Sequence, residues 1–159
     1  MRVYVCVSSK GEEMMRYDFV ADQEDNQFYP VCETDIEEAE RTLGLKFPFE
    51  LRKFLLEVGY GFLRGSEYNI NLIMGPFSIR DARLKVNDFE FYPDIELYED
   101  LEAGKLLFFE ANESALLLIE ISEEQHNAIY YDDIKIADSL EEFLEKMMED
   151  DNYYIDLAG

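Results

Sequence analysis

The amino-acid sequence predicts an α+β fold, in which helices pack on a mostly antiparallel sheet. Two helix patterns come first, β-rich segments fill the middle of the chain, and another helix pattern follows them. The length of 159 residues suits one domain, and the 48% of apolar residues can supply its core. We therefore expect a single domain without internal repeats or linkers.

The first predicted helix begins at Thr34 and ends at Gly44. Thr34 and Glu37 have the T-x-x-E spacing of a capping box, in which two side chains bind free backbone amides at the helix start. Gly44 suits the left-handed conformation that commonly ends a helix. A narrow apolar stripe predicts the face that packs on the core, and it contains Ile36, Ala39 and Leu43.

The second predicted helix follows Phe47 and has Pro48 in its first turn, where a missing amide hydrogen costs nothing. Gly59 and Gly61 end it. Its core-facing stripe follows the i, i+3, i+4, i+7 spacing of a helix and consists of Leu51, Phe54, Leu55 and Val58.

The third predicted helix follows Ser139, which forms a second capping box with Glu142. The residues after 148 form an acidic tail, and we expect its tyrosines to order it in part. The apolar stripe of this helix consists of Leu140, Phe143, Leu144, Met147 and Met148.

Strands are predicted at the start and in the middle of the chain. Residues 3–7 form a β-branched run, and residues 15–20 are expected to return as the second strand of an N-terminal hairpin. Polar turns separate three further strands, as in antiparallel hairpins, at residues 106–109, 115–121 and 128–131. Weaker patterns predict a strand within 68–73, a short helix within 77–86, and a loop with a helical turn over 88–102.

Charge is the strongest signal in the composition. The chain has 14 Lys and Arg against 37 Asp and Glu, which gives a formal net charge of −23. Such a field disfavours nucleic acid and anionic membrane surfaces, because both are bound by clustered cations. It favours a basic protein partner by steering the encounter. Solubility is the alternative explanation, although a small soluble domain needs a net charge of only about 2–8.

The two cysteines, Cys6 and Cys32, match no metal-binding spacing, and we expect free, reduced and buried thiols. The start of the chain lacks a signal-peptide core, and no apolar run approaches the roughly 18 residues that span a bilayer. These features predict a cytoplasmic protein without a membrane segment.

No catalytic constellation is recognisable in the sequence. The single histidine, His126, is expected on a surface hairpin loop without a nucleophile beside it. A pair of acids could still perform acid–base catalysis, but 37 acids make some pair inevitable. Asp132-Asp133 and residues 149–151 are rich in oxygen, yet neither resembles a twelve-residue calcium loop. We predict no enzyme, no cofactor and no bound metal.

Two patterns stand in order at the spacing of one domain. The second covers residues 129–132 and 136–144. The first consists of Ile36, Ala39, Glu40, Leu43 and Gly44, then Phe47-Pro48, Phe54-Leu55 and Gly59-Tyr60-Gly61. Together they resemble the SUKH superfamily, which includes the yeast cell-wall assembly regulator and many bacterial immunity proteins. The chain departs from the family pattern at residues 112–114, where glycines are common, and after the second helix.

The resemblance implies a SUKH-like domain over residues 34–148. A hairpin extension over residues 1–33 would precede it and pack on it, and an acidic tail over residues 149–159 would follow it. Bacterial members of the superfamily mostly bind and neutralise toxin domains, often nucleases or deaminases, so the resemblance implies stoichiometric binding rather than catalysis. Since a nuclease domain is usually basic, an acidic protein would complement it. An intracellular regulator or scaffold of the fungal type is the alternative.

Candidate partner contacts lie in the acidic and aromatic segment of residues 90–100. Aromatic side chains anchor desolvated interface patches, and carboxylates would flank them here. The alternative is a loop whose aromatic side chains fill the core. Tyr60, between two glycines, is a further candidate, the alternative being a helix end. The predicted contacts are Tyr60, Phe91, Tyr92, Asp94, Glu96, Tyr98, Glu99 and Asp100.

Overall fold

The structure is a computed structural model that describes residues 16–112 and 115–158. Within these ranges, seven strands form one sheet in which each strand pairs antiparallel with the next along the chain. This confirms the predicted α+β class. The strands are β1 (Gln27–Tyr29), β2 (Tyr60–Phe62), β3 (Leu72–Ile73), β4 (Lys105–Asn112), β5 (Ala115–Glu120), β6 (Ile129–Tyr131) and β7 (Ile134–Ala137).

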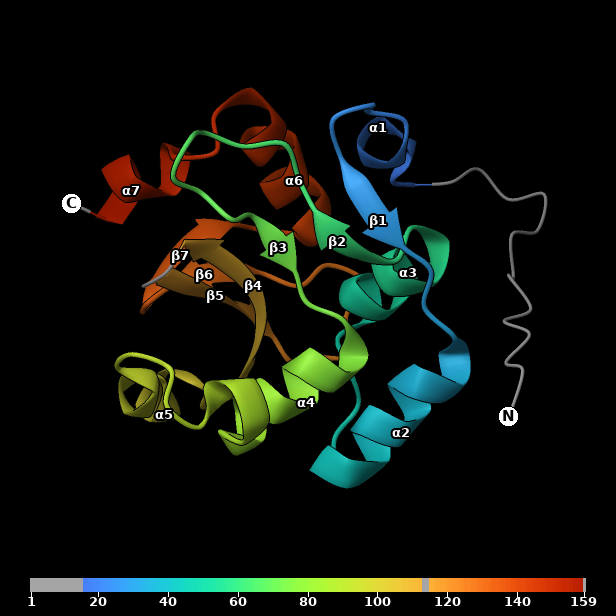
Figure 1. Ribbon diagram of the computed structural model, residues 1–159, viewed down its shortest axis with the longest axis vertical. Helices are drawn as coiled ribbons and strands as arrows, with labels where there is room; N and C mark the ends of the chain where they lie inside the picture. The colour runs from blue at the N-terminus through green and yellow to red at the C-terminus, as the bar shows by residue number, and fades with distance from the viewer. Residues whose placement is uncertain (1–15, 113–114, 159) are drawn as a thin grey trace.

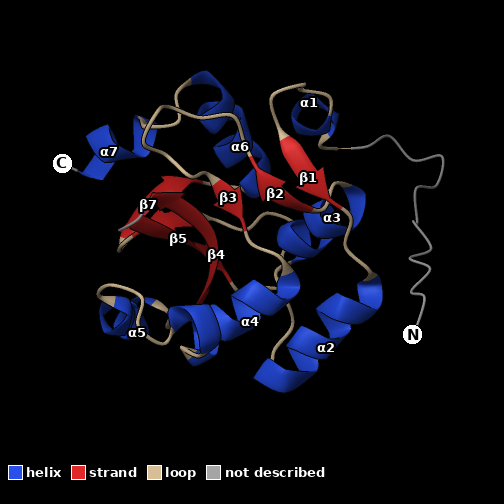
Figure 2. Ribbon diagram, in the orientation of Figure 1, coloured by secondary structure: helices blue, strands red, loops and turns tan. Residues whose placement is uncertain are grey.

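Helices lie on both sides of this sheet (Figures 1 and 2). In Figure 1, α6 lies behind β2 and β3 and α3 lies next to β1 and β2, whereas α4 and α5 lie beside β4. The helices are α1 (Asp18–Ala21), α2 (Glu33–Leu43), α3 (Phe49–Glu57), α4 (Pro76–Leu84), α5 (Tyr98–Leu101), α6 (Leu140–Glu149) and α7 (Tyr153–Ala158), with 3₁₀ turns η1 (Asn87–Phe89) and η2 (Ile95–Leu97).

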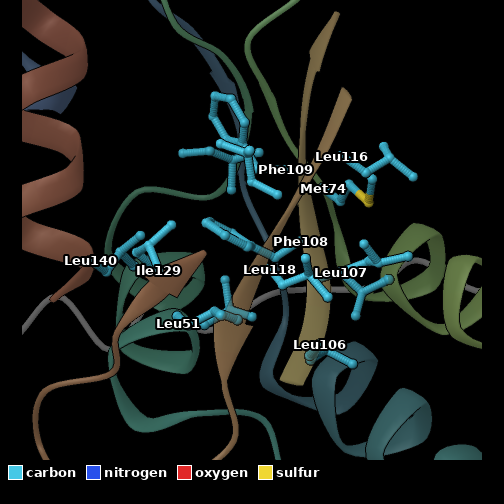
Figure 3. Close-up of a cluster of buried hydrophobic side chains, with 14 of the residues drawn as sticks. Leu51, Met74, Leu106, Leu107, Phe108, Phe109, Leu116, Leu118, Ile129 and Leu140 are labelled. Atoms are coloured by element: carbon cyan, nitrogen blue, oxygen red, sulfur yellow. The ribbon is translucent and has the colours of Figure 1, made fainter. Parts of the chain in front are cut away.

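The core surrounds β4 and β5, whose apolar side chains are buried on both faces of the sheet. Phe109 meets Phe143 of α6 edge to face, with ring centroids 5.2 Å apart. Figure 3 shows Leu51 of α3 and Leu140 of α6 beside side chains of the central strands. The continuous apolar run of β5 is therefore explained by burial on two sides.

The first predicted capping box is wrong. Helix α2 begins at Glu33 and its N-cap is Cys32, without a side-chain cap hydrogen bond. Thr34 therefore lies inside the first turn, where it cannot cap the helix. The second predicted capping box is confirmed in its Ser139 half, because the Ser139 Oγ accepts a hydrogen bond from the Glu142 amide at 3.0 Å. The Glu142 carboxylate lies 2.9 Å from Lys146 Nζ.

The strands predicted at 106–109, 115–121 and 128–131 are confirmed as β4, β5 and β6, and the short helix within 77–86 as α4. The strand within 68–73 shrinks to β3, because Tyr68 is 84% exposed in a loop. The strands β1, β2 and β7 were not predicted. Gly59 and Gly61 do more than end a helix, since a Cβ atom on either would collide with the backbone of β1.

Two further expectations for the N-terminal part need correction. The predicted return strand at 15–20 is wrong in its described part, because Asp18–Ala21 forms α1 with Tyr17 and Val20 buried in the core. Residues 3–7 lie outside the described residues. Cys32 is disulfide-bonded and only half-buried, which corrects the expected buried free thiol, and Cys6 lies outside the described residues.

The predicted acidic tail contains α7. Its Tyr154 is fully buried against the core, 5.1 Å from the ring of Tyr131. Tyr153 donates a hydrogen bond from its hydroxyl to the Ile136 carbonyl at 2.9 Å. Tyr153 and Tyr154 therefore hold α7 against β6 and β7 at the edge of the sheet.

Candidate partner-binding surface

The segment from Asn87 to Leu101 is a chain of short turns, η1, η2 and α5, that is hydrogen-bonded to β4 and β5. Its buried side chains recur at every third residue, the repeat of a 3₁₀ turn. In Figure 1, α5 lies at the lower left, beside α4. The inward residues are Phe89, Ile95 and Tyr98, with Tyr92 half-buried among them.

Two hydroxyl groups fix the segment to the sheet. The Tyr98 hydroxyl accepts a hydrogen bond from the Leu116 amide at 3.1 Å, and burial raises the pKa of Tyr98. The Tyr92 hydroxyl donates to the Asn112 carbonyl at 3.4 Å. The segment is thus a braced part of the fold rather than a loose loop.

The outward side of this segment combines apolar and acidic groups. Phe91 is 89% exposed and Leu97 is 66% exposed, so both project into solvent. Asp94 adopts a left-handed conformation with φ of 59°, which turns the chain between η1 and η2. The acidic knob, as we call this surface, consists of Glu90, Phe91, Asp94, Glu96, Leu97, Glu99 and Asp100, all exposed.

The structure brings together most of the predicted contact residues. Phe91, Asp94, Glu96, Glu99 and Asp100 share the acidic knob, whereas Tyr92 is half-buried. Tyr98 is only 7% exposed and supports the knob from inside. Leu97 lies in the predicted segment of residues 90–100 but was not among the predicted contacts, which favoured aromatic and acidic residues; the spacing of three between buried residues could have identified it.

Tyr60 lies on a different surface from the knob. On β2, its ring lies 5.3 Å from that of Tyr29 on β1. Both side chains are more than a third exposed.

Several other carboxylates bind groups within the protein itself. Glu50 is fully buried, and its Oε1 accepts hydrogen bonds from the amides of Asn127 at 2.6 Å and Leu140 at 3.0 Å. It therefore caps the positive end of α6 from a different helix. Glu102 lies 2.6 Å from Lys85 Nζ, and burial raises its pKa despite that cation.

Asp151 ties the end of α6 to the loop between β2 and β3. Its carboxylate accepts hydrogen bonds from the Ser66 amide at 2.7 Å, Asn69 Nδ2 at 2.7 Å and Asn71 Nδ2 at 2.9 Å. Burial favours the protonated acid, but the hydrogen bonds outweigh it and lower the pKa of Asp151 to about 2.

No group of three metal-ligating side chains occurs in the residues that the structure describes. His126 is exposed in the loop between β5 and β6. Asp132 and Asp133 are exposed in the turn between β6 and β7. Within the described ranges, none of the helices has the length and apolarity needed to cross a bilayer.

The spacing of the helices, glycines and central strands agrees with a known family. Residues 33–144 match the SUKH family model described as SMI1-KNR4 cell-wall. The chain belongs to this SUKH family. It is 57% identical over 143 residues to the Immunity protein YxxD of Bacillus subtilis (strain 168), which covers 90% of this chain and 97% of that protein. No solved structure matches the chain.

The opening SUKH pattern is explained by contacts within the fold. Glu40 is buried, and its Oε2 accepts a hydrogen bond from the Phe47 amide at 2.8 Å. Its Oε1 lies 2.9 Å from Arg52 Nη1 of α3. One carboxylate thus joins α2, the turn before Pro48 and α3, so these residues maintain the fold.

Proposed function

We propose that this protein is an immunity protein that binds a toxin domain stoichiometrically and neutralises it without catalysis, in the cytoplasm of the cell that makes it. The observation that carries the proposal is the 57% identity to a protein named an immunity protein, over nearly the full length of both chains.

The acidic knob is the surface we assign to the toxin. Phe91 and Leu97 offer apolar area that a partner can bury, and exposed carboxylates surround them. With a net charge of −23, the protein would attract a basic domain over several ångströms before contact. Nucleases are basic because they hold phosphate, so occlusion of a nucleic-acid groove is the mechanism that fits this surface.

Co-purification tests the proposal. The tagged protein is isolated from its own cells, and its partners are identified by mass spectrometry. We expect the toxin domain of a secreted protein at one-to-one stoichiometry, and mixing the purified pair should abolish the toxin's activity. The family description favours a second function, regulation of cell-wall assembly. Capture of cell-wall enzymes in place of a toxin would establish that function and overturn ours.

The knob is tested by a double variant, Phe91→Ser with Leu97→Ser. Both side chains are exposed, so the fold should be unaffected while the dissociation constant for the toxin rises by about 100-fold, the loss of about 3 kcal/mol expected for two anchors. Tyr68→Ser is the matched control, since Tyr68 is 84% exposed on another loop. Equal affinity of the double variant and the control would place the interface elsewhere.

Salt dependence tests the electrostatic part separately. Raising the salt concentration from about 0.05 M to about 0.5 M shortens the screening length several-fold, so association with the toxin should slow by at least about tenfold. The rate is measured by stopped-flow mixing of the purified pair. An unchanged rate would show that charge does not guide this encounter.

A further inference from the structure

The sheet has one face covered by helices and one that is partly open. Phe28 meets Phe54 of α3 with ring centroids 5.8 Å apart, and Phe109 meets Phe143 of α6 at 5.2 Å. These contacts define the covered face. In Figure 2, no described helix lies in front of β1, β2 and β3, and α6 lies behind β2 and β3.

The strand register determines what the open face carries. Residues directly opposite each other in antiparallel strands share a face. Phe62 pairs with Gln27 on one side and with Leu72 on the other, and Leu72 pairs with Glu110. Side chains also alternate between faces along a strand, so Tyr60 and its partner Tyr29 point the same way as Phe62. The open face consists of Gln27, Tyr29, Tyr60, Phe62, Leu72 and Glu110.

The aromatic part of the open face is exposed and held in place. Tyr29, Tyr60 and Phe62 are 38%, 37% and 40% exposed. A Cβ atom on Gly75 would lie 3.2 Å from Cγ of Tyr60, so the missing side chain lets the tyrosine ring lie against the start of α4. An aromatic surface fixed before binding loses little side-chain entropy when a partner covers it.

Glu110 is the unusual member of the open face. It is half-buried between Leu72 and Leu116 in neighbouring strands, and burial is the cause that raises its pKa. Among the described residues, no side chain or amide is bound to its carboxylate. Arg64 lies two residues after the end of β2, and its guanidinium pairs with Asp25 at 3.6 Å rather than with Glu110. A cation that reached this partly desolvated carboxylate would offset the cost of its ionised form.

We propose that the open face is a second contact surface in addition to the acidic knob and binds an arginine of the toxin, with the guanidinium on Glu110 and the side chain lying over Leu72 against Phe62 and Tyr60. Two strand spacings, about 10 Å, separate the backbones of β2 and β4, so one arginine lying over β3 lies close to both. Arginine fits better than lysine, since its planar, weakly hydrated group stacks on aromatic rings and pairs with carboxylates through two parallel hydrogen bonds. This inference rests on the proposed function for the identity of the partner.

The first test needs no toxin. The full-length, ¹⁵N-labelled protein is titrated with N-acetyl-arginine amide while the backbone amide shifts of Phe62, Leu72 and Glu110 are followed. We expect saturable shifts at these three residues with the arginine probe, and none with N-acetyl-citrulline amide, which has a similar shape but no charge. Glu110→Gln should abolish the response, whereas Glu38→Gln, at an exposed acid of α2, should leave it intact. Equal shifts with both probes, no shifts, or an unaffected Glu110→Gln protein would overturn the proposal.

The second test uses the captured toxin. Glu110→Gln should weaken its binding by at least tenfold, and a photo-crosslinking amino acid at position 62 should form a crosslink to it. A toxin that binds the wild-type protein but is indifferent to Glu110→Gln and forms no crosslink would overturn this inference and leave the proposed function intact. A wild-type protein that captures no toxin would overturn the proposed function, while the arginine titration still decides whether the face recognises arginine.

Discussion

Glu50 is fully buried and Glu110 is half-buried, and the surroundings of the two carboxylates are opposite. Glu50 is fully buried and receives amides from the loop before β6 and from the start of α6. Glu110 is half-buried on the open face, with no donor among the described residues. A carboxylate bound by backbone amides holds the fold together, and a desolvated carboxylate left without them indicates a partner. In a chain with 37 acids, this difference separates structural acids from candidate contacts.

The largest effect is expected at Glu50. Glu50→Ala removes the acceptor for the amides of Asn127 and Leu140 and leaves both buried without a partner. We expect the free energy of unfolding to fall by about 3–5 kcal/mol, as for other buried charged hydrogen-bond networks. Urea unfolding measures it, with the exposed Glu38→Ala as control. A loss below about 1 kcal/mol would show that Glu50 is not structural.

Asp151 should have the next largest effect, and one that depends on pH. Its folded pKa of about 2 lies below its ordinary value of 3.8, so folding favours the ionised form. This stability is therefore fully present above pH 3.8 and is lost as the pH falls through about 2. Near neutral pH, Asp151→Ala should lower the free energy of unfolding by about 2–3 kcal/mol. The lost pKa shift and the hydrogen-bond donors left without an acceptor both contribute.

The test for Asp151 is urea unfolding at pH 6 and at the lowest pH at which the wild-type protein still folds. The difference between wild type and Asp151→Ala should shrink toward the acidic end. Asp133→Ala, an exposed acid in the turn between β6 and β7, should show no such trend. A gap that stays constant with pH would mean that packing, and not the ionised carboxylate, matters at this position.

The helices were predictable from the sequence because their stripes are local patterns. Leu51, Phe54 and Leu55 lie one turn apart on α3 and are all buried. The short strands β1, β2 and β7 were not predictable, because three or four residues do not establish an alternation and their pairing is decided by distant segments. Gly61 illustrates this: its sequence context indicates a helix end, whereas its role comes from the close approach of β1.

The candidate site could be predicted from the sequence only in part, because distant segments also decide which of its side chains are exposed. An acidic and aromatic composition locates the knob, but which side chains point outward depends on 3₁₀ turns that place Tyr98 inside and Leu97 outside. The open face could not be predicted at all. Glu110 shares a face with Tyr60 and Phe62 only through the registers of two consecutive strand pairs, and it lies about 50 residues from them along the chain.

The smallest effect, and the one of opposite sign, is expected for Glu110→Gln. Burial raises the folded pKa of Glu110 above its ordinary value of 4.5, so folding disfavours its ionised form. That cost is absent below pH 4.5 and grows as the pH rises through the raised pKa, since the folded protein must then hold an unpaired charge. Removal of the charge should therefore stabilise the protein near neutral pH, by less than about 1 kcal/mol, and have no effect at low pH.

Thermal unfolding at pH 7.5 and pH 4 measures both effects, with Glu99→Gln as the exposed control. A variant that is more stable but binds its toxin less well would show that this carboxylate is kept for the partner; a less stable variant would mean that Glu110 belongs with Glu50 among the structural acids.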